Sequence, residues 1–328
     1  MKYRILGKTK YKVSEISYGS WSLGGADWGD VSEDQAFAVL NKAVDLGVNF
    51  IDTADVYGDG RSEKLIGKFL KTRKDKIIVA TKLGRRLSPH IAKGYTKENL
   101  NKFVDRSLDN LGVKTLDLLQ LHCPPPAAYY DPEVFEALDE MVKNKKIKFY
   151  GVSVEKVEEA LKAIEYPGVS TIQIIFNMFR QRPAELFFQQ AKKKNIGVIV
   201  RVPLASGLLS GKMTKTSTFP KNDHRNFNRE GKSFDVGETF AGVPFETGLE
   251  AVGELKKIKP DGFSMPQFAL KWILMHDAVS TVIPGGKRPE QIEDNVMTSK
   301  LPNLSDQTIK KIKTIYTDFI KPHVHQRW

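Results

Sequence analysis

The sequence is poor in cysteine and has no long apolar run. Cys123 is the single cysteine in 328 residues, so no disulfide can form within the chain and a reducing cytoplasm is the expected compartment. No apolar run approaches the ~18 residues of a membrane span. Residues 1–19 contain no apolar stretch of the kind found in signal peptides. We therefore expect a cytoplasmic protein that does not associate with membranes.

Several motifs of nucleotide, acyl and metal chemistry are also missing. No Gly-x-Gly-x-x-Gly follows a predicted strand, which argues against a doubly wound dinucleotide fold, and no Gly-x₄-Gly-Lys-Ser/Thr phosphate loop occurs. No Gly-x-Ser-x-Gly nucleophile elbow is present. His122 has no histidine, cysteine pair or second acidic cluster at metal-ligand spacing. We therefore expect no metal site.

The chain is strongly basic, with 51 Lys and Arg against 39 Asp and Glu and a formal charge of +12. The lysines are spread over predicted helix faces and do not gather in one arm, so a nucleic-acid partner is not favoured. A positive field also attracts small polyanionic ligands. The charge therefore fits a phosphate-bearing cofactor as well as a solvated surface.

Eight short apolar runs alternate with amphipathic segments. Continuous runs of this length are typical of strands that are covered on both faces. Eight such units favour a closed (β/α)₈ TIM barrel of class α/β over an open sheet. The predicted strands are 16–18, 49–52, 77–81, 116–121, 149–153, 171–176, 197–201 and 281–283.

The predicted helices are recognised by their ends. Ser32 and Thr96 stand at N-cap positions, Gly47 and Gly112 follow the last turns, and Pro132 opens a third helix. The predicted helices are 32–47, 96–112, 131–146, 154–165, 183–195 and 265–277.

Three features lie outside the eightfold pattern: an N-terminal hairpin at the barrel floor, a long insertion after the seventh strand, and an extra C-terminal helix. They span residues 1–15, 211–245 and 305–320, and a further helix is expected over 246–258. No Pro-rich or Ser/Gly-rich linker interrupts the chain. Residues 1–328 are therefore expected to form a single barrel domain.

Polar residues follow the second, third and fourth predicted strands. Asp52 and Tyr57 lie in "FIDTADVYGDGRSE", Lys82 in "ATKLG" and His122 in "LLQLHCP". In a (β/α)₈ barrel the carboxyl ends of the strands form the active site, so we expect these side chains to converge.

Together these four side chains make a tuned proton donor. The free tyrosine pKa of ~10 should be lowered by a lysine ammonium, which Asp52 would keep charged. His122 could hold a carbonyl oxygen, and the set would suit carbonyl reduction beside a hydride source. A lone strand-end aspartate usually caps a turn and a lone tyrosine usually packs, and Asp55 is expected to be a turn or helix-start residue. It is the combination that favours a catalytic site.

These motifs resemble the aldo-keto reductase family, and the resemblance covers nearly the whole chain. The similarity is to the bacterial, archaeal and channel-β-subunit-like branch more than to the vertebrate metabolic enzymes. It implies a barrel that binds NADPH in an extended form without a Rossmann motif. It also implies that Tyr57 is the general acid, assisted by Lys82, Asp52 and His122.

The resemblance implies further cofactor residues at the later strand ends. Ser153 matches one member of a Ser-Asn pair for the nicotinamide amide, but Val154 departs from the second. Gln173 matches the residue that bonds the carboxamide, although a core glutamine satisfied by backbone is the competing interpretation. Arg201 stands where many relatives have a stacking aromatic, and a guanidinium can stack on a ring or reach a phosphate.

The remaining cofactor residues lie in four loops. In "YGSWSLGG", Ser20 is expected near the cofactor and Trp21 in the pocket wall, and in the insertion Arg225 is expected to meet a phosphate. Glycines and a helix start in "VIPGGKRPEQIEDN" would admit the adenosine phosphate, and Lys287 with Arg288 favours NADPH over NADH. The pyrophosphate residues are Pro203, Leu204, Ala205, Ser206, Gly207 and Lys212. The adenosine-phosphate residues are Gly285, Lys287, Gln291, Asp294 and Asn295.

Three functions remain open from the sequence. The first is NADPH-dependent reduction of a small carbonyl compound. The second is a redox-sensing or regulatory subunit that binds NADPH and turns over slowly. The third is a barrel isomerase or aldolase that uses Lys82 as a Schiff base, which requires a lysine free of Asp52. The substrate and the oligomeric state are not encoded in any recognisable motif.

Overall fold

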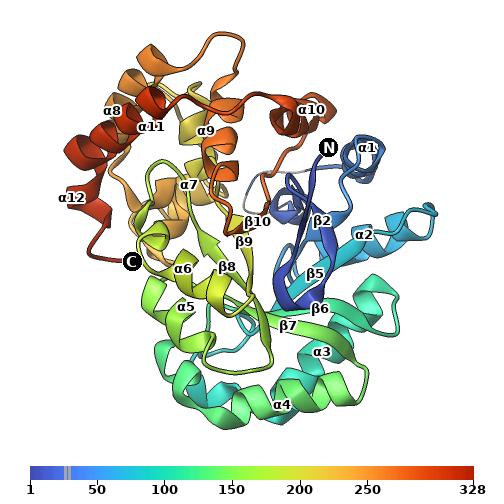
Figure 1. The fold of residues 1–328 in the computed structure, drawn as a ribbon. Helices are drawn as coiled ribbons and strands as arrows, with labels where there is room; N and C mark the ends of the chain where they lie inside the picture. Colours follow the sequence, from blue (N-terminus) through green and yellow to red (C-terminus); the bar gives the residue numbers. More distant parts are fainter. Residues whose placement is uncertain (26–27, 29–30) are drawn as a thin grey trace.

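A closed ring of parallel strands forms the centre of the computed structural model, which describes residues 1–25, 28 and 31–328 (Figure 1). Strands β3 to β10 pair in sequence order, and a parallel bridge from Ile16 to Val282 joins the first strand region to the last. The predicted (β/α)₈ barrel is confirmed. The strands are β3 (Tyr18–Gly19), β4 (Phe50–Asp52), β5 (Ile78–Leu83), β6 (Leu116–His122), β7 (Ile147–Ser153), β8 (Val169–Ile175), β9 (Gly197–Arg201) and β10 (Val279–Val282).

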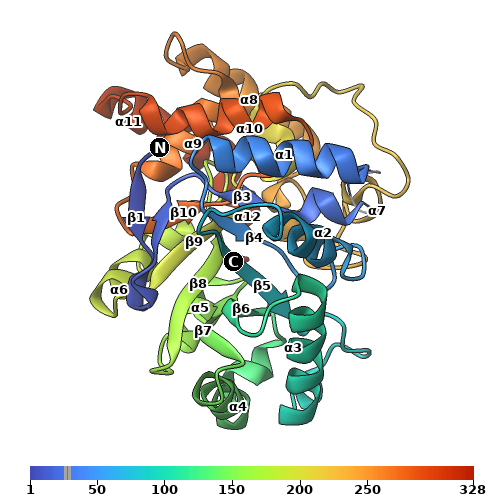
Figure 2. The same ribbon diagram turned by 90° about the vertical axis from the view of Figure 1, so that its right-hand side faces the viewer.

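Helices surround the strands on the outside, as Figure 2 shows. Ser32 accepts from the amide of Gln35 and Thr96 from that of Asn99, so both predicted N-caps are present. Among the helices of the ring, α2 was not predicted, because Gly60 precedes it in place of a Ser, Thr, Asp or Asn cap. The helices of the ring are α1 (Glu33–Asp45), α2 (Arg61–Leu70), α3 (Lys97–Leu111), α4 (Pro132–Lys143), α5 (Val157–Ala163), α6 (Phe187–Lys193), α9 (Met265–Leu274) and α10 (Pro289–Met297).

Alternate strand residues face the inside of the barrel and build its floor. The predicted hairpin, β1 (Tyr3–Ile5) with β2 (Lys12–Ser14), pairs antiparallel and adds Leu6 and Val13 from beneath. The apolar side chains of the floor form one buried cluster. Its buried members are Leu6, Val13, Phe50, Ile78, Ala80, Leu118, Ile199 and Ile283.

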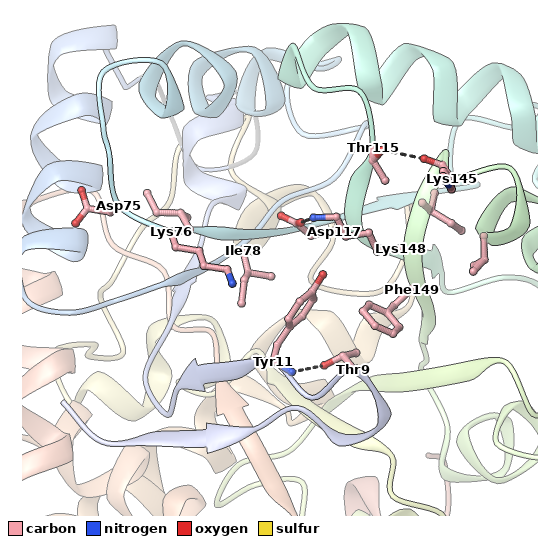
Figure 3. Close-up of a pocket in the computed structure, with 13 residues that line it drawn as sticks. Thr9, Tyr11, Asp75, Lys76, Ile78, Thr115, Asp117, Lys145, Lys148 and Phe149 are labelled. Carbon is pink, nitrogen blue, oxygen red and sulfur yellow. Dashed lines mark hydrogen bonds and ion pairs between the residues drawn. The ribbon is translucent and has the colours of Figure 1, made fainter.

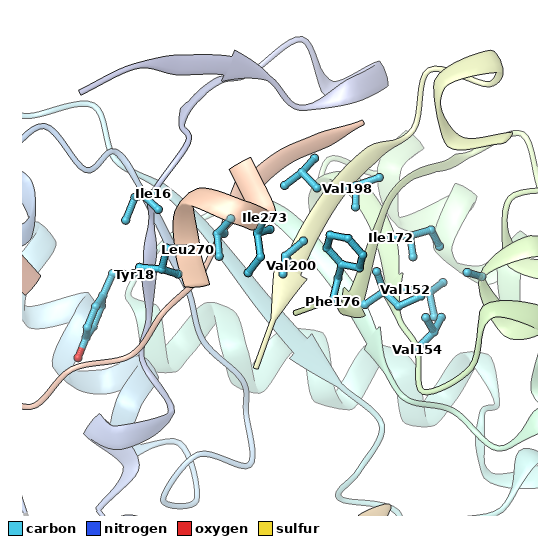
Figure 4. Packing of buried hydrophobic residues seen from close by; sticks show 14 of the residues in the cluster. Ile16, Tyr18, Val152, Val154, Ile172, Phe176, Val198, Val200, Leu270 and Ile273 are labelled. Atoms are coloured by element: carbon cyan, nitrogen blue, oxygen red, sulfur yellow. The ribbon is translucent and has the colours of Figure 1, made fainter. Parts of the chain in front are cut away.

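The outward-facing strand residues pack against the helices. Figure 4 shows Val198 and Val200 of β9 beside Leu270 and Ile273 of α9, and these four side chains are buried. Complete burial of such a side chain contributes about 1.5–3 kcal/mol. The outer layer therefore fixes the strands, and with them the loops at their carboxyl ends.

The insertion and the C-terminal segment pack on one side of the barrel. The insertion contains α7 (His224–Phe227) and two 3₁₀ turns, η8 (Val236–Glu238) and η9 (Phe240–Gly242), and the expected extra helix is α8 (Phe245–Ile258). The predicted C-terminal helix is α11 (Asp306–Ile315), which continues as a π-helical turn, η11 (Tyr316–Ile320), and α12 (Lys321–Val324). Among the described residues, no helix combines the length and apolar character that a membrane crossing requires.

Candidate active site

Asp52 at the end of β4, Tyr57 in the loop after it and Lys82 near the end of β5 form one network of contacts. Lys82 Nζ donates to Asp52 Oδ1 at 2.5 Å and to the Thr53 carbonyl at 2.8 Å. The same nitrogen lies 3.2 Å from Tyr57 Oη. Because β4 and β5 pair in parallel, both strands end at the same rim, and the loop before α2 folds Tyr57 back over Lys82. The predicted convergence is therefore present in the structure.

Asp52 is saturated with donors in the barrel interior. Its Oδ2 accepts from Gln173 Nε2 at 2.7 Å and from Gln120 Nε2 at 3.1 Å, in addition to the Lys82 contact on Oδ1. A buried ion pair is tolerated only when further hydrogen bonds replace the lost water. Gln120 was not predicted, although it stands two residues before His122 on the same face of β6, which the strand alternation could have indicated.

The electrostatics of Lys82 and Tyr57 follow from burial and from their neighbours. Burial opposes the charge on Lys82, but Asp52 and Tyr57 outweigh it, so the lysine pKa is raised above its usual value. Burial raises the pKa of Tyr57, and Lys82 only partly offsets this rise. Lys82 does lower the pKa of Tyr57, but burial raises it by more. The predicted net decrease of this pKa was therefore wrong. Tyr57 keeps its proton at neutral pH, and Lys82 stays charged.

His122 lies beside the phenol as a neutral imidazole. Its ring centroid is 6.0 Å from that of Tyr57, with the ring planes at 84°. Burial, with the charges of Arg85 and Lys82, places the His122 pKa well below its usual range. Its Nδ1 is buried without a hydrogen-bond partner among the described residues. A neutral imidazole offers one donor and one acceptor, so the ring can donate to a substrate oxygen.

A cavity of about 820 Å³ opens above these residues. Asp52, Tyr57 and His122 form its inner end, with the indoles of Trp21 and Trp28 nearby. Three sequence-predicted residues do not line it: Lys82, Ser153 and Ala205. The predicted residues that do line it are Ser20, Trp21, Asp52, Tyr57, His122, Gln173, Arg201, Pro203, Leu204, Ser206, Gly207, Lys212, Arg225, Gly285, Lys287, Gln291, Asp294 and Asn295.

The three residues outside the cavity are fully enclosed by protein. Lys82 is 1% exposed and reaches the site only through Tyr57 and Asp52. Ser153 is buried, and its Oγ lies 3.7 Å from Cys123 Sγ. Ala205 is buried in the turn after β9. The contact of Ser153 with the nicotinamide amide stays a prediction.

Comparison with known proteins agrees with this geometry. The model of the aldo/keto reductase family matches residues 15–317. The chain belongs to this family. It is 29% identical to aldo-keto reductase yakc [NADP(+)] of Schizosaccharomyces pombe over 92% of this chain and 88% of the relative. It is also 29% identical to a probable voltage-gated potassium channel subunit beta of Arabidopsis thaliana, over 96% of each chain.

A solved structure of the same family superposes over almost the whole chain. The glycerol dehydrogenase AKR11B4 from Gluconobacter oxydans aligns with a TM-score of 0.78 and 31% identity, covering 98% of this chain and 95% of that one. The aldo/keto reductase resemblance found in the sequence, including its channel-subunit-like branch, is thus confirmed. As a member of this family the protein is an NAD(P)H-dependent oxidoreductase.

The outer end of the cavity fits a polyanionic cofactor. Lys212, Arg225, Lys287 and Arg288 all line it. A Cβ added at Gly286 would lie 2.7 Å from Ile292 Cδ1, so this loop packs closely against a side chain of α10. The loop lies directly before α10, and Glu290 and Gln291 in the first turn of that helix line the cavity. Phosphate groups are anionic, and cationic side chains and the start of a helix at the same rim both favour their binding.

Several of the predicted adenosine-phosphate residues already hydrogen-bond within the protein. Gln291 Oε1 accepts from the amides of Lys287 at 2.9 Å and Arg288 at 3.2 Å. Asp294 accepts from Ser264 at 2.8 Å, and Asn295 donates to the Gly285 carbonyl at 3.4 Å. These side chains therefore shape the loop, whereas the cationic side chains supply its charge.

Arg201 and three unpredicted residues form a buried charge cluster beside the cavity. Arg201 Nη2 donates to Glu155 at 2.8 Å, and its Nη1 lies 3.5 Å from Glu238. Arg85 pairs with both carboxylates. Both terminal nitrogens of Arg201 face these acids, and its predicted contact with the cofactor stays a prediction. The cluster joins four segments that lie far apart in the sequence, which no local sequence pattern could reveal.

Two other places among the described residues resemble ligand sites. Cys123, Glu155 and Glu238 bring ligand atoms within 4.8 Å of one another, a spacing suited to a metal ion, but Arg85 and Arg201 already occupy the carboxylates. The absence of a metal stays a prediction from the sequence.

A second hollow of about 670 Å³ lies between the hairpin and the start of β5 to β7 (Figure 3). Tyr11 and Phe149 meet there edge to face, and Lys148 is paired with Asp117 at 2.7 Å. None of the sequence-predicted site residues lines this hollow. The cavity at the carboxyl ends of the strands is therefore the candidate active site.

Proposed function

We propose that the protein is an NADPH-dependent reductase of aldehydes or ketones in which Tyr57 protonates the carbonyl oxygen. One observation carries the proposal: Lys82 Nζ lies 3.2 Å from Tyr57 Oη and is held as an ammonium by Asp52 at 2.5 Å. A phenol that faces a ligand cavity and backs onto a buried cation is equipped to release a proton.

The residues divide the work of the reaction between them. When bound, the nicotinamide supplies a hydride to the carbonyl carbon. Tyr57 holds its proton until the substrate oxygen gains charge, and then donates it. The phenolate left behind faces the Lys82 ammonium, an attraction of about 4 kcal/mol for unit charges 4 Å apart at an effective dielectric constant of 20. The neutral His122 can donate a hydrogen bond to the same oxygen and so orient it.

The cofactor end supports NADPH over NADH. Lys287 and Arg288 line the cavity where the adenosine end is expected, and two cations favour an additional 2′-phosphate. Gln173 uses its amide nitrogen on Asp52, so its carbonyl oxygen is the atom left to accept from the nicotinamide amide.

One assay tests this function. Tryptophan fluorescence follows titration with NADPH and with NADH, and NADPH absorbance then follows turnover with a panel of small aldehydes. We expect tighter binding of NADPH and turnover with at least one aldehyde. If neither nucleotide bound, or if no member of the panel were reduced, the proposed function would be wrong.

The structure argues against one of the two alternative functions, the Schiff-base reaction, and leaves the other, a regulatory subunit, open to test. The Schiff-base reaction requires Lys82 to be free of Asp52, and the 2.5 Å contact contradicts this requirement. The slow regulatory subunit has support from the similarity to a channel subunit. It predicts NADPH binding with very slow turnover of every aldehyde, so the same assay separates it from a metabolic reductase.

The remaining sequence predictions stand as part of this proposal. They are a single domain, a cytoplasmic location in keeping with one cysteine, and no nucleic-acid or membrane partner.

A further inference from the structure

Trp328 is inserted between two arginines, far in sequence from the catalytic residues. Its side chain is 3% exposed, and the guanidinium carbons of Arg180 and Arg327 lie 4.1 and 4.2 Å from its ring. The indole Nε1 donates to Asp235 Oδ1 at 2.9 Å. Arginine on an indole face is favourable by about 0.5–2 kcal/mol, more when desolvated. The indole is therefore firmly seated.

The segment that receives the indole is residues 235–242 of the insertion, here called the clasp. A Cβ at Gly242 would lie 2.5 Å from Trp328 Cη2, and one at Gly237 would lie 3.0 Å from its Cε2. Gly242 also has a φ of +77°, which disfavours other residues. In Figure 1 the C-terminus lies beside this gold segment, and α12 contacts η9. The clasp is thus shaped around the ring of Trp328.

The clasp presents Glu238 to the catalytic cavity. Glu238 lines the cavity with Tyr57 and His122, and its carboxylate pairs with Arg85 and lies 3.5 Å from Arg201. The Glu238 carbonyl accepts from Ser206 Oγ at 2.9 Å, which ties the clasp to the turn after β9. Glu238 is only 4% exposed, so its carboxylate depends on the two arginines and not on water for its partners.

We propose that Trp328 is a positioning residue for the substrate end of the cavity, because it fixes the clasp so that Glu238 stands between Arg85 and Arg201. Its kinetic consequence depends on the proposed reductase function, whereas its structural consequence does not. The adenosine end of the cavity is built from residues 284–295, which lie outside the clasp, so NADPH affinity should depend on Trp328 less than KM does.

Four variants test the proposal: Trp328→Ala, Trp328→Phe, Glu238→Gln, and Trp328→Ala combined with Glu238→Gln. Hydrogen exchange of the clasp, the Kd for NADPH, and KM and kcat with glyceraldehyde are measured for each. Trp328→Ala should speed exchange in the clasp and raise KM about tenfold, with a smaller change in the Kd for NADPH. Trp328→Phe keeps the stacked ring but loses the bond to Asp235, so its effects should be smaller.

The double variant gives the decisive comparison. If Trp328 acts through Glu238, the combined variant should have a KM close to that of Glu238→Gln alone. Multiplied effects would overturn the proposal, and so would unchanged clasp exchange in Trp328→Ala.

Ile312→Ala is the matched control, because Ile312 is buried in α11, which contacts α8, and its loss lowers stability elsewhere in the same C-terminal segment. A KM rise in this control equal to that of Trp328→Ala would contradict the proposal. If the unmodified protein reduces no aldehyde, the proposed function fails, but the exchange measurement still decides whether Trp328 fixes the clasp.

Discussion

The floor of the barrel and the polar layer above it are built by the same strands, two residues apart. Phe50 lies below Asp52 on β4, and Leu118 lies below Gln120 on β6. Residues two apart on a strand share a face and are separated by about 7 Å. A step of two residues along β4 or β6 thus changes the interior from an apolar to a polar side chain.

The difference shows how stability and chemistry are separated in this molecule. Floor side chains need no partner, because burial alone stabilises them. In the upper layer, both oxygens of Asp52 need donors, which Lys82, Gln120 and Gln173 provide. We therefore expect substitutions in the floor to affect folding, and those in the layer above to affect turnover.

The largest expected effect is that of Lys82→Met. The variant removes the cation that stabilises the Tyr57 phenolate, so kcat should fall by about 10²–10⁴. Asp52 would also lose its counter-ion, which should lower the free energy of unfolding by about 3–5 kcal/mol. Steady-state kinetics and denaturant unfolding measure the two effects. A pH–rate profile like that of the unmodified protein would show that Lys82 does not tune the proton donor.

The next largest effect is that of Leu118→Ala in the floor. A cavity should form at a fully buried site and lower the free energy of unfolding by about 2–5 kcal/mol. Since the catalytic residues lie one layer higher, kcat at a temperature where the protein stays folded should change less than twofold. A large loss of kcat in the folded variant would contradict the expectation that the floor affects folding and only the upper layer affects turnover.

A smaller effect is expected at Asp55, which lies outside the barrel interior. Both its carboxylate oxygens are buried without a hydrogen-bond partner among the described residues, and burial, with Glu63 nearby, raises its pKa to about 7. In the unfolded chain the same group loses its proton near pH 4, whereas in the native state it keeps its proton up to about pH 7. The free energy of unfolding therefore falls as pH rises from about 4 to 7, because ionisation stabilises the unfolded chain.

Asp55→Asn should therefore raise the free energy of unfolding at pH 8 by about 1–3 kcal/mol, and with it the Tm. At pH 4 the substitution should change the Tm little. Thermal unfolding at both pH values measures the difference. Asp109→Asn, at an exposed position of α3, serves as the control for the loss of one carboxylate. Equal shifts at pH 4 and pH 8 for Asp55→Asn would contradict the assignment.

Most of the barrel could be predicted because short apolar runs in the sequence identify the strands. Every predicted run overlaps a strand, but the boundaries shift, as in β8, which begins at Val169 where 171 was expected. Boundaries depend on pairing with neighbours, which one segment does not encode. Helix α2 was missed because Gly60 carries no capping side chain.

Residues of the candidate site could be predicted only where a recognisable sequence motif lies at the end of a predicted strand. Asp52, Tyr57, Lys82 and His122 follow strands within short motifs, and the barrel brings them together. Glu238 could not be found, because it reaches the cavity from an insertion without periodic pattern. The sign of the Tyr57 pKa shift also needed the structure, since burial outweighs the nearby Lys82 ammonium.

The most direct test of the central claim is the turnover of Tyr57→Phe, measured together with NADPH affinity. Phenylalanine keeps the ring and removes the proton that faces the cavity. The account predicts that kcat falls by about 10²–10⁴ while the Kd for NADPH changes less than twofold. Turnover equal to that of the unmodified protein would contradict the assignment of Tyr57 as the proton donor.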